Sequence, residues 1–119
     1  MTHPFRAAVE TGQFATIGSI FAEDGVLHSP IAHRPYRGRA VIATVVGTVA
    51  TVLDDFRFVR ELDGALIFQA TVDGLEIQGC DILHTDDDGL VDEITVMMRP
   101  LKAVAAFAAR MRAELSDGA

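Results

Sequence analysis

Alternation of apolar and polar residues runs through the second half of this 119-residue sequence. From Asp54 to Met98 four segments alternate in this way, and short turns separate them. Two of the turns are Asp-Gly pairs, at 63–64 and 73–74, and the third is Asp-Asp-Asp-Gly at 86–89. Successive side chains of a strand point to opposite faces, and Asp-Gly favours tight hairpins. The pattern therefore predicts a meander of four long antiparallel strands.

The remaining long segments have the spacing of helices. Segments 3–11 and 13–22 predict one broken helix or two short ones, because Gly12 interrupts the apolar pattern. Segment 39–53 is rich in β-branched residues, but its length exceeds that of a usual strand and favours a helix. Segment 101–115 follows a proline and predicts a last helix. One side of the 39–53 helix is expected to pack through Val41, Val45, Thr48 and Val52.

A short strand is expected at 24–30, where Pro30 ends it, and a loop at 31–38. Helices and antiparallel strands are thus segregated along a single domain, 1–119, which indicates the α+β class. A strongly curved antiparallel sheet wrapped on helices would form a cone with an apolar pocket at one end. Periodicity predicts the strands and helices but does not by itself predict this curvature.

The third long strand contains a carboxylate on its apolar face. Alternate positions share a face, which places together Leu75, Ile77, Gly79, Asp81 and Leu83. An unpaired charge among apolar neighbours costs free energy, so the position of Asp81 requires an explanation. In a dry pocket its pKa would rise and it would become a neutral hydrogen-bond donor. The alternative is a structural aspartate that a backbone N–H, a tyrosine or a histidine satisfies.

Composition limits the classes of partner and the location. The formal charge of −7 opposes nucleic acid and anionic membranes as partners and fits a neutral, apolar small molecule. A single cysteine, Cys80, excludes an internal disulfide and is compatible with a reducing compartment. The first residues have no apolar stretch of signal-peptide type, and the longest uncharged run, 40–53, is shorter than the ~20 residues of a membrane helix. A cytoplasmic protein is expected.

Three stretches together resemble a known family: FAEDGVLHSP, then YRGRAVI, then GCDILHTDDDGLVDEITVMM. In this order they resemble the SnoaL-like polyketide cyclases and ketosteroid isomerases of the nuclear-transport-factor-two-like (cystatin-like) superfamily. The resemblance extends from about the first helix to the last strand. It implies a cone-shaped fold, an apolar pocket between sheet and helices, and a homodimer formed through the sheet.

The resemblance assigns a role to Asp81, but several other catalytic residues of the family are missing from this sequence. Asp81 matches the family aspartate that projects into the pocket and, in ketosteroid isomerases, donates a hydrogen bond to a developing oxyanion. The isomerase base would fall on Ser29 and its phenol near Phe5, so both groups are missing. The His-Trp-Asp run of many SnoaL-like cyclases would fall on 94–96, which is Ile-Thr-Val. Limonene epoxide hydrolases need Arg and Asp where segment 65–72 has neither.

Other candidate site residues lie near the expected pocket rim. His28 or His33 could act as a general base near neutral pH, although a histidine bonded to backbone is the simpler interpretation of each. His28 and Ser29 face opposite ways on a strand, so at most one of them enters the pocket. Tyr36 could donate a hydrogen bond to a ligand. The two histidines lack a third ligand and no H-E-x-x-H occurs, so neither a metal nor another cofactor is expected.

Phe56, Phe58 and Met98 are candidates for ligand contact, and core or interface packing is the competing interpretation. Two functions of different class follow from these residues. One is a cofactor-independent enzyme that transfers a proton on a small apolar carbonyl compound, with Asp81 polarising an oxygen and His28 or His33 moving the proton. The other is a module of the same fold that binds a ligand without chemistry, or that serves only to dimerise.

Overall fold

The computed structural model describes residues 2–117, with side chains up to residue 115. Its elements in chain order are α1 (Pro4–Glu10), the 3-10 helix η1 (Ile17–Ile20), β1 (Phe21–His28), β2 (Tyr36–Arg37), α2 (Arg39–Val52), β3 (Asp54–Leu62), β4 (Ala65–Val72), β5 (Leu75–Thr85), β6 (Val91–Arg99) and α3 (Leu101–Asp117). The predicted α+β class is confirmed.

The sheet has six strands in the order β2-β1-β6-β5-β4-β3. Strands β3 to β6 form the predicted antiparallel meander, in which each strand pairs with the next. At the two Asp-Gly turns, Gly64 and Gly74 have φ of 77° and 78°, a left-handed conformation that suits glycine. β1 comes from the other end of the chain and pairs with β6 in parallel, so the sheet is mixed.

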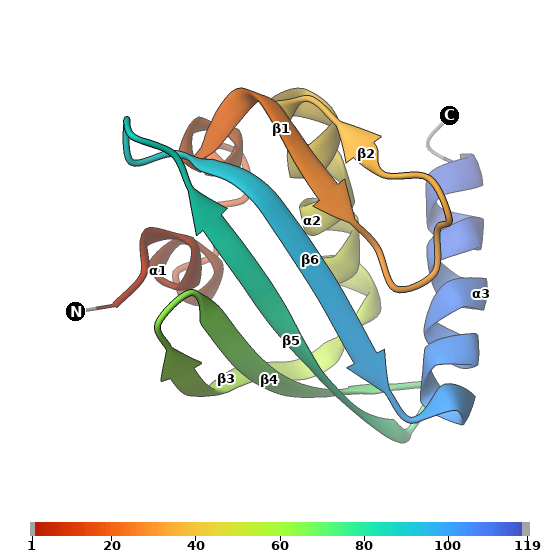
Figure 1. Ribbon diagram of the computed structural model, residues 1–119. Coiled ribbons are helices and arrows are strands. Elements are labelled where there is room, and N and C mark those ends of the chain that lie inside the picture. The colour runs from red at the N-terminus through yellow and green to blue at the C-terminus, as the bar shows by residue number, and fades with distance from the viewer. Residues whose placement is uncertain (1, 118–119) are drawn as a thin grey trace.

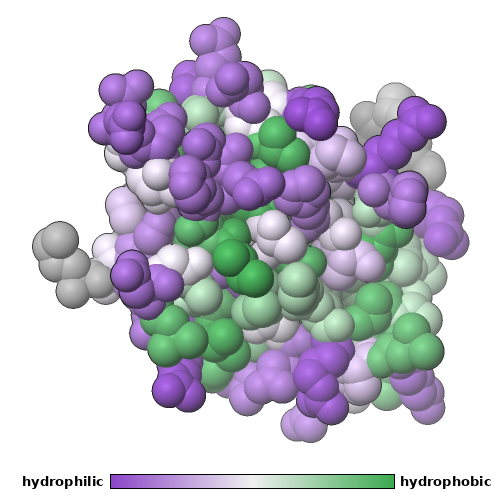
Figure 2. All heavy atoms as spheres, in the orientation of Figure 1, coloured by the Kyte–Doolittle hydropathy of each residue, from purple (hydrophilic) through white to green (hydrophobic). Residues whose placement is uncertain are grey.

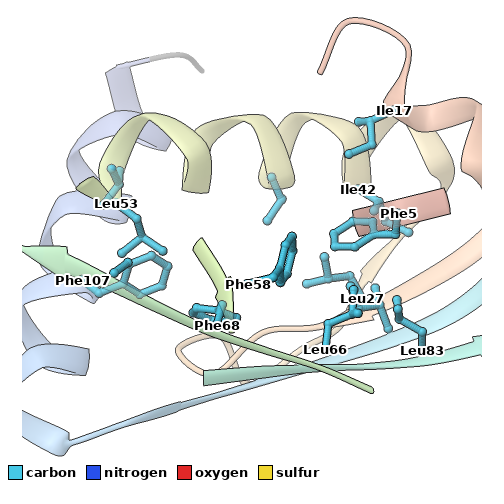
Figure 3. Packing of buried hydrophobic residues seen from close by; sticks show 14 of the residues in the cluster. Phe5, Ile17, Leu27, Ile42, Leu53, Phe58, Leu66, Phe68, Leu83 and Phe107 are labelled. Carbon is cyan, nitrogen blue, oxygen red and sulfur yellow. The ribbon is translucent and has the colours of Figure 1, made fainter. Parts of the chain in front are cut away.

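The sheet curves around the long helix α2, and the described helices lie on its inner side (Figure 1). α3 returns from the end of β6 and runs beside α2 at the side of the sheet (Figure 1). The core fills the space between α2 and the inner face, where Phe58 extends from the sheet toward the helix and Phe68 lies close to the sheet (Figure 3). The outer face of the sheet carries none of the described helices.

Near the N-terminus the prediction of one broken helix or two short ones is half correct. α1 forms where it was expected, and His3 caps it by accepting a hydrogen bond from the Phe5 backbone N–H at 3.0 Å. The second segment forms only the short η1, and Phe21 begins β1 instead of continuing a helix. Phe21 is fully buried, pairs with Val91 of β6 and packs edge-to-face on Phe5 at 5.9 Å. Pairing and burial therefore override the helical spacing.

The predicted packing stripe of α2 is half correct, because Val45 and Val52 are buried as expected. Val41 is instead 44% exposed and Thr48 is half-buried, and Ile42 is the further buried position. Almost every residue of this helix is apolar or small, so several stripes have helical spacing and periodicity cannot select one. In the structure the Arg39 guanidinium donates to the Phe21 carbonyl oxygen at 2.8 Å, which ties the start of the helix to β1.

Candidate functional site

A cavity of about 470 Å³ lies between the inner face of the sheet and α2. Most of its wall is apolar and comes from segments far apart in the sequence: α1, α2, α3, the inner faces of the strands and the loop after β1. Its polar lining residues are Glu10, Ser29, Tyr36, Arg57 and Asp81. The sheet curves around α2 (Figure 1), and the cavity lies between the two.

Asp81 lies on the inner face of β5 and lines the cavity. Its neighbours across the sheet are Leu66 on β4 and Val96 on β6, both apolar. Among the described side chains, the one that is both polar and buried is that of Asp81, which is 6% exposed. The alternation of β5 correctly predicted this inward orientation.

No donor among the described residues forms a hydrogen bond with the Asp81 carboxyl group, although its side chain lines the cavity. Loss of hydration on burial raises the pKa of Asp81 from the ordinary 3.8 to about 7, since no nearby cation compensates. The carboxyl group therefore exists in both protonated and ionised forms near neutral pH.

Ser29 lies in the same cavity as Asp81. β1 and β6 pair with Leu27 beside Ile94 and His28 beside Thr95, so the next residue, Ser29, falls beside Val96. Because Val96 in turn pairs with Asp81, two strand spacings of ~4.8 Å separate the two polar residues, or roughly 10 Å. The Ser29 hydroxyl oxygen accepts from the Ile31 backbone N–H at 3.1 Å, which leaves its O–H free to donate.

The other candidate ligand contacts also line the cavity. Tyr36 belongs to β2, a short strand that replaces part of the expected loop and pairs with Leu27. Phe56 packs against Phe58 edge-to-face and stacks on Phe68, with ring centroids 5.0 Å apart in both pairs. Met98 extends from the inner face of β6. Core packing and cavity lining are therefore not alternatives here, because the same side chains do both.

The two histidines lie away from the cavity. His28 is on the outer face of the sheet, where its Nε2 is 3.0 Å from Glu93 Oε2. His33 is exposed in the loop between β1 and β2 and does not line the cavity. The structure therefore does not bring either histidine to Asp81. Strand alternation limited the choice to His28 or Ser29, and Ser29 is the one that faces inward.

Several lining residues were not recognised from the sequence. Val96 separates Ser29 from Asp81, and its alternation with Ile94 and Met98 could have identified it. Glu10 and Phe14 reach the cavity from the N-terminal segment, and no sequence signal indicates this, because it depends on how α1 docks.

Within the described part of the chain, no group of three or more His, Cys, Asp or Glu side chains is arranged to hold a metal ion. No described helix is long and apolar enough to cross a membrane.

The structure is thus an α+β cone with an apolar cavity and one buried carboxyl group. A steroid delta-isomerase from Pseudomonas aeruginosa is 33% identical, with a TM-score of 0.84 over 94% of this chain and 90% of that one. An uncharacterised protein with a cystatin-like fold from Silicibacter pomeroyi is 32% identical, with a TM-score of 0.89 over 97% and 87%. A ketosteroid isomerase-like protein from Catenulispora acidiphila, in complex with trimethylamine, is 14% identical, and the match covers 91% of this chain and 95% of that one. Its TM-score of 0.62 shows that the two proteins share the fold.

Neither a protein-family model nor the sequence of a curated protein matches the chain. The similarity to the first two structures, at more than 30% identity over nearly the full length, shows its family. The chain belongs to the SnoaL-like and ketosteroid isomerase-like proteins of the nuclear-transport-factor-two-like superfamily.

Proposed function

We propose that this protein binds a small apolar carbonyl compound in the cavity and catalyses a proton transfer on it without a cofactor, as an isomerase or cyclase. The observation that carries the proposal is the Asp81 carboxyl group, which is buried, lines an apolar cavity and has no hydrogen-bond donor from the described chain. A general acid or base works best when its pKa lies near the operating pH, and the pKa of Asp81 is about 7.

In this mechanism Asp81 is the group that moves the proton. Its ionised form takes a proton from the carbon next to the substrate carbonyl group, and the electron pair left behind forms an enolate. The now neutral Asp81 returns that proton to another carbon of the conjugated system, which moves the double bond and restores the carboxylate. The O–H groups of Ser29 and Tyr36, which line the same cavity, would donate to the enolate oxygen.

This assignment changes the roles that the sequence suggested. His28 and His33 lie outside the cavity, so neither is assigned as a base that works beside a neutral Asp81. The sequence similarity to a steroid delta-isomerase supports an isomerisation of this kind. The apolar wall supports a substrate whose body is hydrocarbon, with one carbonyl oxygen to orient it.

The test uses a β,γ-unsaturated cyclic ketone, whose conversion into the conjugated enone is followed by ultraviolet absorbance. Removing the proton-carrying group by Asp81→Asn should lower kcat by at least ~10²-fold. Asp88→Asn, at an exposed position in the turn before β6, is the matched control and should retain the full rate. Equal rates for wild type and Asp81→Asn would rule out this role of Asp81.

A second function, binding without chemistry, is favoured by one observation. The cavity lining contains one buried ionisable group, whereas proton-transfer sites often combine two. Binding of 2-naphthol, an apolar phenol, would then depend on Asp81 while no ketone substrate is converted. Calorimetric titration of wild type and Asp81→Asn, run beside the rate assay, separates the two functions.

We also propose that the protein is a homodimer formed through the outer face of the sheet. Large apolar side chains are exposed there: Leu62 (46%), Ile82 (43%) and Met97 (55%). Figure 2 shows this face, with hydrophobic and neutral residues across its middle and hydrophilic residues around them. Met97→Asp should convert the dimer into a monomer in sedimentation experiments. A cytoplasmic location also stays a proposal, supported by the single cysteine, Cys80.

A further inference from the structure

An irregularity in β3 turns an acidic side chain toward the inner side of the sheet. Phe58 pairs with Phe68 across β3 and β4, and a second inner-face pair is Glu61 with Leu66. Between these pairs β3 advances by three residues while β4 advances by two, which is a β-bulge. Strict alternation from Phe58 would point Glu61 outward, so the bulge is what places Glu61 on the same face as buried Leu66.

Glu61 docks α1 on the sheet through both of its carboxylate oxygens. Its Oε2 accepts from the His3 backbone N–H at 3.1 Å, and its Oε1 accepts from Arg6 Nη1 at 3.4 Å. The Arg6 guanidinium carbon also lies 5.8 Å from the centre of the Phe58 ring, which is a cation–π distance. These contacts hold α1 against the inner side and so determine which of its side chains reach the cavity.

Glu10, the last residue of α1, lines the cavity beside the same arginine. Arg6 Nε lies 3.2 Å from Glu10 Oε2, but this nitrogen forms no hydrogen bond, so the contact is an ion pair only. No donor among the described residues forms a hydrogen bond with the Glu10 carboxylate. The side chain is 45% exposed, which places it where the cavity meets solvent. Its oxygens are therefore available to a ligand.

The positions of the two acidic residues that line the cavity set the length of a ligand that contacts both. Strand pairing aligns Glu61, Leu66 and Asp81 in one row, so two strand spacings of ~4.8 Å, or roughly 10 Å, separate Glu61 from Asp81. Arg6 connects the Glu61 end of this row with Glu10. A ligand that reaches from Asp81 to Glu10 then spans on the order of 10 Å, the length of about two six-membered rings.

The opening of the cavity near Glu10 carries a negative charge. Arg6 is shared between Glu10 and Glu61, so one positive charge stands against two negative ones. His3 adds no charge at neutral pH, because burial lowers its pKa and its Nδ1 accepts a hydrogen bond. Arg57, the cation among the described lining residues, directs its guanidinium to a backbone carbonyl oxygen and to a glutamine on the outer face of the sheet.

We infer that Glu10 is a specificity-determining residue that accepts a hydrogen bond from a hydroxyl group at the outer end of the ligand. The inference rests on the proposed function and narrows its substrate class. The substrate is an apolar compound of about two rings or more, with its carbonyl group at Asp81 and a hydroxyl group at the opposite end. Hydrogen bonds to an ionised acceptor are stronger than neutral ones, which favours this hydroxyl. A carboxylate at the same end would meet a like charge and be disfavoured.

The test is calorimetric titration with two pairs of probes: 2-naphthol with naphthalene-2,6-diol, and 4-phenylphenol with biphenyl-4,4′-diol. At least one diol should bind wild type about tenfold more tightly than its mono-hydroxy counterpart. Glu10→Ala should remove this preference. Glu10→Gln, which keeps the size of the side chain and removes its charge, should lower it to less than about threefold. Glu114→Ala, at an exposed position of α3, is the matched control and should retain the full preference.

An anionic probe tests the repulsion independently of ligand length. 6-Hydroxy-2-naphthoate should bind wild type at least about tenfold more weakly than 2-naphthol, and Glu10→Ala should reduce this difference. A diol preference that persists in Glu10→Ala, or that is absent for both diols in wild type, would overturn the role of Glu10 and leave the proposed function standing. Equal rates for wild type and Asp81→Asn, with the diol preference intact, would overturn only the proton transfer. If wild type binds none of the probes, the role of Glu10 and the proposed ligand class fall together.

Discussion

The ring of Phe68 occupies the space that a side chain on Gly79 would need: a Cβ at position 79 would lie 2.5 Å from Phe68 Cζ. The same Cβ would lie 2.5 Å from the Met97 carbonyl oxygen. Gly79 and Phe68 are paired across β5 and β4 on the inner face, two residues before Asp81 along β5. The missing side chain therefore lets an aromatic ring pack flat on the sheet next to the carboxyl group.

Gly79→Ala is expected to destabilise the fold by about 2 kcal/mol or more, because neither the ring nor the backbone oxygen can give way freely. The measurement is the free energy of unfolding in urea. Gly47→Ala is the matched control: it lies inside α2, nothing lies within 4 Å of its Cβ position, and alanine there should stabilise by ~0.5–1 kcal/mol. Equal effects of the two substitutions would contradict the packing argument.

The stability of the protein should depend on pH through Asp81. Its pKa in the folded state, about 7, lies above the ordinary 3.8, so the folded protein binds the proton more tightly than the unfolded chain. Stability is then lost as pH rises from about 4 to about 7. The difference between the two pKa values corresponds to about 4 kcal/mol at ~1.4 kcal/mol for each pH unit.

Asp81→Asn replaces the neutral acid with a group of similar shape that does not ionise. Relative to wild type, this variant should gain about 3 to 4 kcal/mol of stability between pH 4 and pH 8. Urea unfolding of both proteins at the two pH values measures the difference, and Asp88→Asn serves again as the control. Parallel stability curves for wild type and Asp81→Asn would show that the carboxyl group is hydrated in the folded protein.

Val96→Phe tests whether ligands occupy the space between Ser29 and Asp81. The larger side chain would fill the cavity between the two polar residues, so the affinity for 2-naphthol should fall at least ~10-fold. The free energy of unfolding should decrease by less than ~3 kcal/mol, because the ring enters a space that is already open. Unchanged affinity in a folded Val96→Phe protein would place the ligand elsewhere.

His84 should titrate at a higher pH than an isolated histidine. Its Nδ1 is 2.6 Å from Asp92 Oδ1, and this hydrogen bond is the largest cause that raises the pKa of His84, followed by the charge of Asp92. Asp92→Asn should therefore lower the pKa of His84 in an NMR titration of the ring protons. A titration curve that Asp92→Asn leaves unchanged would mean that the pair does not form in solution.

The local sequence pattern was sufficient to predict the meander and the inward orientation of Asp81. The two Asp-Gly turns fix where β4 begins and ends, and the period of two then determines which residues of each strand share a face. The inward orientation of Asp81 follows from its place between Gly79 and Leu83, both buried. This orientation does not depend on which strands pair with β5, because alternation is a property of the extended backbone.

Strand alternation could not decide whether His28 or Ser29 faces the cavity. Alternation states that they face opposite sides of β1, but the choice of side depends on the pairing of β1 with β6, in parallel and far apart in the sequence. Half of the packed stripe of α2 was missed for a related reason. Val41 and Ile42 are both apolar, and only the docking of the helix on the sheet buries Ile42 and exposes Val41.

The sequence by itself thus determined the antiparallel strands, the α+β class and the presence of a carboxylate on an apolar face. Tertiary structure alone decided that this face borders a cavity, that Ser29 lines the same cavity, and that His28 and His33 lie outside it. The physical reason is the range of the interactions: turns and alternation depend on neighbouring residues, whereas the curvature of the sheet and the docking of the helices depend on contacts between distant segments.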